Sequence, residues 1–352
     1  MIKNNKGFAI TTMLYGILAM ILILLLLILR IMSSTYNINS NFVSSIEKNM
    51  NDCVEEELYL EDCYINGSDC DATSYYSCLG IREEETVKDP TAKKIADELK
   101  KLVVTSGSGL YKDPYVNDRY IYRGLDDTEE IRNFIHYSGY KWRIVAIEPN
   151  GGLKLVLYEM PSGIPSLIWN TAADVDQDLN TITWNTTTLH SFLSTSFFRN
   201  SITDVSGMVT KNQSWYTGKI TIPGGVLAIE DAIKMEQKSS FKDNTYGVSA
   251  VGVVSVVDYA KASTNEYCVQ NILGDDNGNC YNWMSSKNRA FWTINGAFDT
   301  DKGMLVDADG KISPYGPATT FDVYPVIYLK AGLELSSSNP GNGTSASPYQ
   351  LN

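Results

Sequence analysis

The feature that constrains this chain most is an uncharged stretch near its N-terminus. Residues 7–29 contain no charged side chain, and residues 13–29 are nearly all Leu, Ile and Met. A helix rises about 1.5 Å per residue, so this stretch is long enough to cross a hydrocarbon layer of roughly 30 Å. The sequence therefore predicts a transmembrane helix over residues 8–32. A cleavable secretory signal is the alternative, but its apolar region is shorter and ends at a small-residue site, which residues 29–32 do not provide.

The charges around this stretch predict its orientation. Lys3 and Lys6 precede it, and basic residues tend to stay on the cytoplasmic side of a membrane. We therefore expect a single-pass protein of the cell membrane, with everything after Arg30 outside the cell. The net charge is -12 and would repel a phosphate backbone, so nucleic acid is not an expected partner. The 352 residues, 43% of them hydrophobic, suffice for a globular core beyond the anchor.

A second pattern overlaps the start of the apolar stretch. Lys6, Gly7 and Phe8 join a basic leader to the apolar residues. This junction resembles the signal of type IV pilins, which a prepilin peptidase cuts after the glycine. The resemblance implies a leader peptide over residues 1–7, cleavage between Gly7 and Phe8, and other pilin-like subunits as partners. Thr12 stands where pilins carry a Glu that pairs with a neighbouring subunit, which favours a minor pilin-like role. An uncleaved anchor is the alternative.

The part beyond the membrane divides into two regions. Residues 33–105 are acidic and contain cysteines, and the helical spacing of apolar residues over 36–58 predicts a helical stem, with a further helix after Pro90. From about residue 110 the pattern changes to strands and turns, and a Pro-Asn-Gly-Gly run at 149–152 predicts a hairpin. We therefore expect an α+β fold. A long N-terminal transmembrane and stem helix precedes a mixed, irregular-sheet globular domain over residues 110–352.

Short aromatic and glycine-containing motifs follow one another along this domain. They are Gly109-Leu110-Tyr111, Tyr120-Ile121-Tyr122-Arg123-Gly124, Trp142-Arg143-Ile144-Val145, Gly252-Val253-Val254-Ser255 with Asp258-Tyr259, Trp292-Thr293-Ile294-Asn295, Tyr324-Pro325-Val326-Ile327-Tyr328-Leu329, and Gly343-Thr344 with Pro348-Tyr349 and Leu351. In these motifs the region resembles an uncharacterised extracellular domain that is widespread in Gram-positive bacteria. That domain is similar in fold to the C-type-lectin and formylglycine-generating-enzyme class. The resemblance implies architecture and no catalytic residue.

Six cysteines in an exported chain predict three disulfides. Proximity in the sequence pairs Cys268 with Cys280, as a structural staple rather than a redox pair. The other four allow three pairings, among which the sequence does not choose: Cys53, Cys63, Cys70 and Cys78. A zinc site is the alternative for these four, but they form no C-x-x-C motif and have no nearby His.

The loop closed by Cys268 and Cys280 is the candidate binding site. It carries polar acceptors and is followed by aromatic residues: Asp275, Asp276, Asn277, Asn279, Tyr281 and Trp283. Polar acceptors beside aromatic faces are typical of sugar or peptide recognition, so a cell-surface glycan or protein is the expected partner. The alternative is a solvated connection that serves only the disulfide.

No cofactor and no metal site are predicted. Two acidic loops could nevertheless supply oxygen ligands to calcium. One is the 275–279 segment, and the other alternates acidic residues with an amide: Asp174, Asp176, Asp178 and Asn180. Neither has the ligand spacing of an EF-hand, and solvated acidic loops have the same composition.

The sequence lacks the common catalytic motifs. It contains no G-x-S-x-G, no H-E-x-x-H and no phosphate-binding loop. Its two histidines, His136 and His190, fall on an expected apolar strand and on an expected helix over residues 186–199, where we predict structural roles. We therefore predict a membrane-anchored, pilin-like surface protein with a non-catalytic domain for binding or adhesion. The alternative is a membrane-tethered enzyme of the cell envelope.

Overall fold

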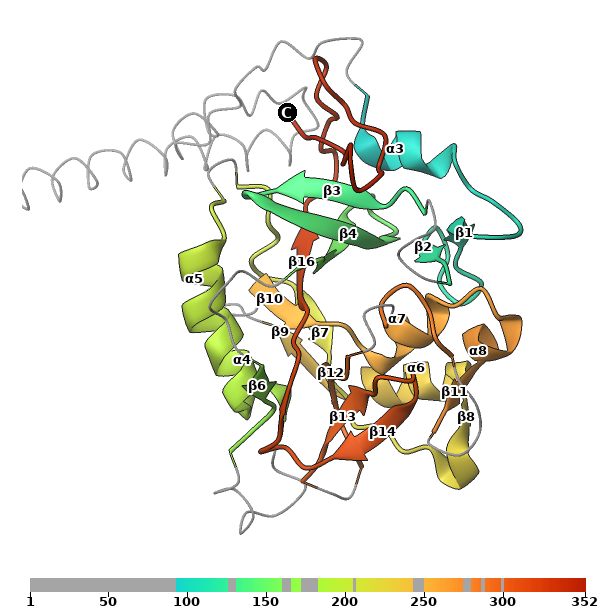
Figure 1. Cartoon of the computed structure of the whole chain (residues 1–352), viewed down its shortest axis with the longest axis vertical. Coiled ribbons are helices and arrows are strands. Elements are labelled where there is room, and N and C mark those ends of the chain that lie inside the picture. The colour runs from blue at the N-terminus through green and yellow to red at the C-terminus, as the bar shows by residue number, and fades with distance from the viewer. Residues whose placement is uncertain are drawn as a thin grey trace, which may run out of the picture. The chain divides into compact units, whose positions relative to one another are not determined.

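The computed structural model describes the globular part of the chain, which belongs to the compact unit Thr91–Asn352 (Figure 1). The described residues are 93–125, 131–159, 166–171, 183–204, 207–242, 250–274, 280–285, 289–298 and 301–352. The predicted leader over 1–7 and the segment 8–32 lie outside these residues, as do Gly7, Phe8 and Thr12.

The predicted fold class, with its long transmembrane and stem helix, is wrong for the described part of the chain. No helix there is long and apolar enough to cross a membrane. The helix expected after Pro90 is α3 (Ile95–Lys100), and it belongs to the globular unit instead of extending a stem. Ile95 and Leu99 are almost fully buried in the core of the domain. A helix of this length is not stable alone in water, so α3 depends on this packing against the domain.

The centre of the unit is a seven-stranded antiparallel sheet, in the order β1-β2-β4-β5-β16-β10, with β3 also paired to β4. Its strands are β1 (Gly109–Lys112), β2 (Tyr120–Arg123), β3 (Phe134–Tyr137), β4 (Tyr140–Ile147), β5 (Leu153–Leu157), β10 (Val251–Val253) and β16 (Pro325–Leu329). All five residues of β5 are buried, so the sheet is covered on both faces at its centre.

Four small antiparallel sheets surround the central one. Their strands are β6 (Leu167–Ile168) with β15 (Thr320–Phe321), β7 (Ser214–Tyr216) with β9 (Ser240–Lys242), β8 (Val226–Ala228) with β11 (Asn271–Leu273), and β12 (Phe291–Gly296), β13 (Gly303–Val306) and β14 (Ile312–Tyr315).

The helices are short throughout the described ranges. They are α3, the 3₁₀ turns η2 (Trp184–Thr186) and η4 (Pro223–Gly225), α4 (Thr188–Phe192), the π-helical turn η3 (Leu193–Phe197), α5 (Phe198–Ser201), α6 (Ile229–Gln237), α7 (Val256–Lys261) and α8 (Glu266–Gln270). Figure 1 shows α6, α7 and α8 close to β8 and β11, and α4 next to β6. The helix expected over 186–199 is confirmed as the run α4, η3 and α5.

The hairpin predicted at residues 149–152 is confirmed. It joins β4 to β5, and its turn is closed by the Glu148 amide, which donates to the Gly152 carbonyl at 2.8 Å. The Asn150 side chain accepts from the Gly152 amide at 2.8 Å, while Gly151 takes a φ of 86°, a value that favours glycine.

The disulfide between Cys268 and Cys280 is confirmed, with Cα atoms 5.5 Å apart. Cys268 lies in α8, and both cysteines are buried with Leu273 in a small apolar cluster. The four stem cysteines, Cys53, Cys63, Cys70 and Cys78, lie outside the described residues.

Replacing both Cys268 and Cys280 by serine should lower the free energy of unfolding by about 2–3 kcal/mol, because the closed loop restricts the unfolded chain. The double variant avoids leaving one reactive thiol. Urea unfolding followed by tryptophan fluorescence measures the change, since all six tryptophans lie beyond residue 140. An unchanged midpoint would show that the disulfide does not stabilise the domain.

Candidate functional site

The candidate loop is only partly within the described residues. Asp275, Asp276, Asn277 and Asn279 lie outside them. Tyr281 is half-buried, whereas Trp283 is 3% exposed and donates from its ring nitrogen to the Tyr122 carbonyl at 3.1 Å. The Arg143 guanidinium lies 4.3 Å from the centre of the Trp283 ring. Trp283 is therefore a core residue, and one face of its ring is covered by Arg143.

The second predicted calcium loop also lies outside the described residues, with Asp174, Asp176, Asp178 and Asn180. In the ranges that are described, no cluster of His, Cys, Asp or Glu is arranged to hold a metal ion. His136 is exposed on β3, and His190 is buried on α4 with its Nε2 atom 3.1 Å from the Ser194 hydroxyl.

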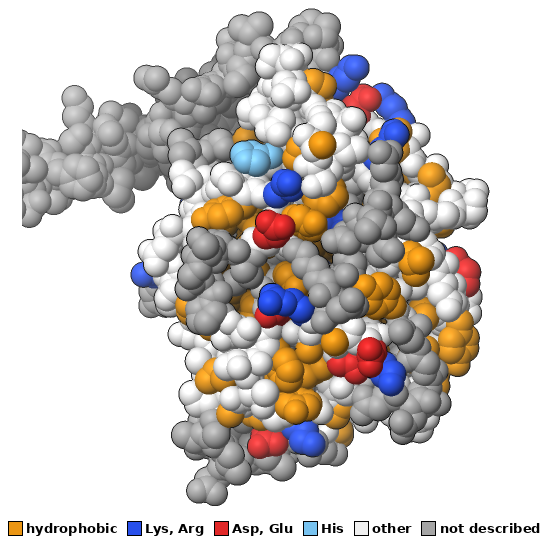
Figure 2. Space-filling view, viewed as in Figure 1, with side chains coloured by type: hydrophobic (Ala, Val, Ile, Leu, Met, Phe, Trp, Pro, Cys, Tyr) orange, Lys and Arg blue, Asp and Glu red, His pale blue; other side chains and the backbone are white. Residues whose placement is uncertain are grey.

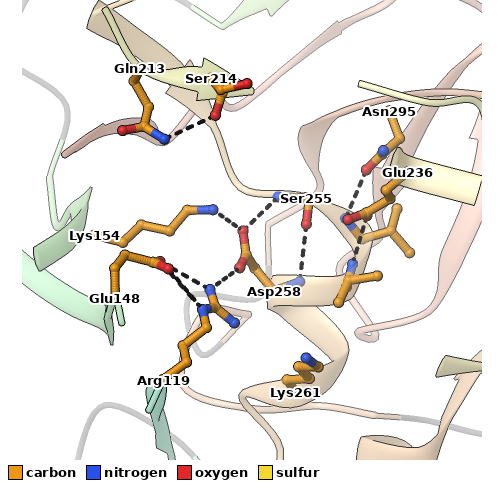
Figure 3. A network of polar contacts seen from close by, with 12 residues as sticks. Arg119, Glu148, Lys154, Gln213, Ser214, Glu236, Ser255, Asp258, Lys261 and Asn295 are labelled. Atoms are coloured by element: carbon orange, nitrogen blue, oxygen red, sulfur yellow. Dashed lines mark hydrogen bonds and ion pairs between the residues drawn. The ribbon is translucent and has the colours of Figure 1, made fainter. Parts of the chain in front are cut away.

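A cavity of about 530 Å³ opens beside the central sheet. Its volume falls within the roughly 300–1,000 Å³ typical of small-molecule sites. The β4–β5 turn, β7, the end of α6 and the start of α7 surround it. Figure 3 shows the polar side chains at its base, with Asp258 in the middle of the group.

Helix α7 brings Asp258 to the base of the cavity. Ser255 caps the helix: its hydroxyl accepts from the Asp258 amide at 3.1 Å, and the Asp258 carboxylate accepts from the Ser255 amide at 3.2 Å. The Val256 amide donates to the Asn295 side chain at 2.9 Å, and the Val257 amide donates to the Glu236 carboxyl at 3.1 Å. The first amides of the helix are thus all bonded to side chains of the protein.

Arg119 connects three carboxylates beneath the cavity, and Figure 3 shows two of them, Glu148 and Asp258. Its guanidinium donates to Asp113 at 3.0 Å, to Asp258 at 3.2 Å and to both oxygens of Glu148 at distances from 3.2 to 3.3 Å. Burial alone would lower the pKa of Arg119, but the surrounding carboxylates raise it above its ordinary value. Arg119 therefore stays charged and holds three chain segments together.

Two lysines complete the ionic network. The Lys154 ammonium donates to the Asp258 carboxylate at 2.5 Å, and the Lys261 ammonium lies 3.0 and 3.1 Å from the two oxygens of Asp113. Burial alone would raise the pKa of Asp258, but Lys154 and Arg119 hold it well below its ordinary value. Asp258 is therefore ionised, and both of its oxygens are occupied.

Glu236 behaves differently from the other carboxylates. It is 5% exposed at the end of α6, and no ion pair with a Lys or Arg is found for it among the described residues. Burial raises the pKa of Glu236 to about 8, and the neighbouring Asp258 carboxylate adds to this rise. At neutral pH most molecules therefore carry Glu236 as the uncharged acid.

One wall of the cavity is aromatic. The rings of Trp215 and Tyr328 meet edge to face with centres 5.1 Å apart, and the Lys154 ammonium lies 5.1 Å from the Tyr328 ring centre. Gly252 allows this arrangement, because a Cβ atom there would lie 2.6 Å from the Trp215 ring. The wall is therefore built by β5, β7, β10 and β16 together.

The rim of the cavity has a different character from its base. The exposed residues of the lining carry no charge: Pro149, Asn150, Ser214, Tyr216 and Gln237. Tyr216 is 52% exposed. On the face drawn in Figure 2, charged side chains are scattered among apolar and neutral ones rather than gathered in a patch of one sign.

Comparisons with known proteins give no relative. No family model matches the chain, and neither a curated protein nor a solved structure matches it. The resemblances to a pilin signal and to an extracellular Gram-positive domain therefore stay predictions.

Sequence reasoning did not find this cavity. Its ionic residues are far apart in the chain: the sequence separation is 139 for Arg119 and Asp258 and 104 for Lys154 and Asp258. One local signal was present: Lys154 is the only charged residue in the otherwise apolar strand Leu153–Leu157. A single charge on a fully buried strand indicates a buried partner.

Proposed function

We propose that this chain is a cell-surface binding protein and that the cavity above Asp258 is its ligand site. The observation that carries this proposal is that the charged residues lining the cavity form ion pairs with one another or with nearby residues of the protein. Every ionised side chain in the lining already has a partner of opposite charge within the protein, namely Arg119, Glu148, Lys154, Asp258 and Lys261. The floor of the cavity is therefore rigid, and the uncharged residues of the rim are left to recognise the ligand.

The bonding pattern argues against catalysis. A nucleophile or general base needs an oxygen or nitrogen that can reach the substrate, and both Asp258 oxygens accept from the protein. Glu148 is held by two nitrogens of Arg119. Glu236 is the observation that favours the enzymatic alternative, because a carboxyl with a pKa of about 8 can donate a proton. It has no free partner base among the described lining residues, so we place binding ahead of catalysis.

The cellular location is proposed from the sequence and the disulfide. The uncharged residues 7–29 behind Lys3 and Lys6 support attachment to a membrane with the domain outside the cell. The disulfide of Cys268 and Cys280 fits an oxidising compartment. A pilin-like association with other subunits is supported by the Gly7-Phe8 junction alone.

Ligand-observed NMR with the full chain and a panel of small sugars, amino acids, short peptides and nucleosides tests the proposal. We expect at least one class to bind, and Tyr216→Ala to weaken that binding about tenfold, as removal of an aromatic contact at a binding site does. Tyr267→Ala is the matched control, because Tyr267 is 53% exposed against 52% for Tyr216 and does not line the cavity.

Three results would decide against this proposal. Binding that is lost equally in both tyrosine variants would place the ligand elsewhere. The absence of binding by every class would remove the cavity as a ligand site. Conversion of a bound compound into a product, lost in Glu236→Gln, would replace binding by catalysis.

A further inference from the structure

The charges at the base of the cavity cancel. Three cations, Arg119, Lys154 and Lys261, are paired with three carboxylates, Asp113, Glu148 and Asp258. The remaining acid, Glu236, is buried and bonded to a backbone amide. The floor of the cavity that a ligand would contact therefore has almost no net charge at neutral pH.

This balance disfavours a charged ligand of either sign. An anion would have to compete with the carboxylates that already occupy Arg119 and Lys154. A cation could use the aromatic wall, but the Lys154 ammonium already lies 5.1 Å from the Tyr328 ring and 5.9 Å from the Trp215 ring. A second positive charge there would be repelled.

The rim offers the groups that a neutral polar ligand needs. Gln213, Ser214 and Tyr216 come from one short segment at β7 and all line the cavity, so this part of the lining includes an amide, a hydroxyl and an aromatic residue. Figure 3 shows Gln213 and Ser214 across the cavity from Arg119, with Lys154 between them in this view. Asn150 and Gln237 add further amides, each able to donate and to accept.

We propose that the ligand of this cavity is an uncharged saccharide, held with a ring face against Tyr216 and its hydroxyls toward the amides of the rim. The inference rests on the proposed function of the cavity. A sugar ring has an apolar C–H face and a circumference of hydroxyls, which match an exposed tyrosine beside neutral donors and acceptors. The 530 Å³ cavity accommodates a short oligosaccharide end rather than a polymer.

A charge-matched comparison of sugars tests the inference. The full chain is titrated with neutral N-acetylated chitotriose and with its cationic deacetylated form. It is also titrated with other neutral oligosaccharides and with their anionic uronic-acid forms. We expect binding by neutral members only. Tyr216→Ala should weaken it at least tenfold and Gln213→Ala several-fold, while Tyr267→Ala leaves it unchanged. Binding should also be insensitive to salt from about 0.05 to 0.5 M, because no charge pair forms.

The outcomes separate the inference from the proposed function. If only anionic or cationic sugars bind, or if a non-sugar compound binds in a manner sensitive to Tyr216→Ala while every sugar fails, the saccharide inference is wrong and the cavity remains a ligand site. If neutral sugars bind but Tyr216→Ala and Gln213→Ala have no effect, this cavity does not hold them. If nothing in either panel binds, both proposals are wrong.

Discussion

Replacing Asp258 by asparagine should lower the free energy of unfolding of the domain by about 3–5 kcal/mol, the range found when one partner of a buried ion pair is removed. Asn has nearly the same shape, so the change removes charge and little volume. It leaves the Lys154 ammonium and part of the Arg119 guanidinium without their partner, at side-chain exposures of 8% and 10%. Both side chains are so little exposed that water replaces the lost carboxylate only in part.

A matched control separates burial from charge. Asp231 on α6 pairs with Lys234 at 3.0 Å, but both side chains are largely exposed, at 57% and 70%. Asp231→Asn should therefore change stability by less than about 1 kcal/mol. Urea unfolding of the full chain, followed by tryptophan fluorescence, compares the two variants. If Asp258→Asn is no more destabilising than Asp231→Asn, the network does not hold the site together, and the rigid base that we infer for the cavity is wrong.

The contrast between what the sequence predicted and what it missed follows from distance along the chain. The β4–β5 hairpin was predictable because Asn150 and Gly152 act on each other within the turn itself. The disulfide was predictable because Cys268 and Cys280 are separated by only 12 positions. Each of these features depends on residues that are close together in the sequence, so turn preferences and cysteine spacing predict it.

The cavity belongs to the other kind of feature. Asp113, Glu148 and Asp258 converge on Arg119 only because β2, the β4–β5 turn and α7 are brought together by the central sheet. Nothing in the spacing of acidic residues distinguishes these three from the other Asp and Glu of an acidic chain. The six-residue helix α3 was likewise placed in a stem, since an apolar face indicates burial without indicating the surface that buries it.

The same limit applies to Trp283, which is buried in the core. Its position after the disulfide loop suggested an exposed aromatic face, and the sequence does not reveal that Arg143 covers the ring. Tyr216 is an exposed aromatic residue at the rim of the cavity, and no local pattern in the sequence distinguishes it from the other tyrosines. Exposure of one aromatic among many depends on the packing of distant strands, which local patterns do not determine.

Glu236→Gln should change how stability depends on pH. The pKa of Glu236 is about 8 in the folded domain, against an ordinary value of 4.5. Between pH 4.5 and about 8, Glu236 is therefore protonated in the folded state and ionised in the unfolded state. The contribution of Glu236 to stability is therefore complete below pH 4.5, and it is lost as the pH rises through about 8. Integrated over this window, the loss is roughly 3–5 kcal/mol, at about 1.4 kcal/mol per unit of pKa difference.

Glutamine imitates the protonated acid and can still accept from the Val257 amide, as Glu236 does at 3.1 Å. The variant should therefore match the wild-type chain near pH 5 and exceed it in stability by several kcal/mol near pH 9. Glu230→Gln is the control, because Glu230 lies exposed at the start of the same helix and should leave the profile unchanged. Unfolding free energies at a series of pH values from 5 to about 9 measure the difference. Parallel profiles for the wild-type chain and Glu236→Gln would mean that Glu236 is ionised in the folded domain. The floor of the cavity would then carry a net negative charge, and the charge balance from which we infer an uncharged ligand would be lost.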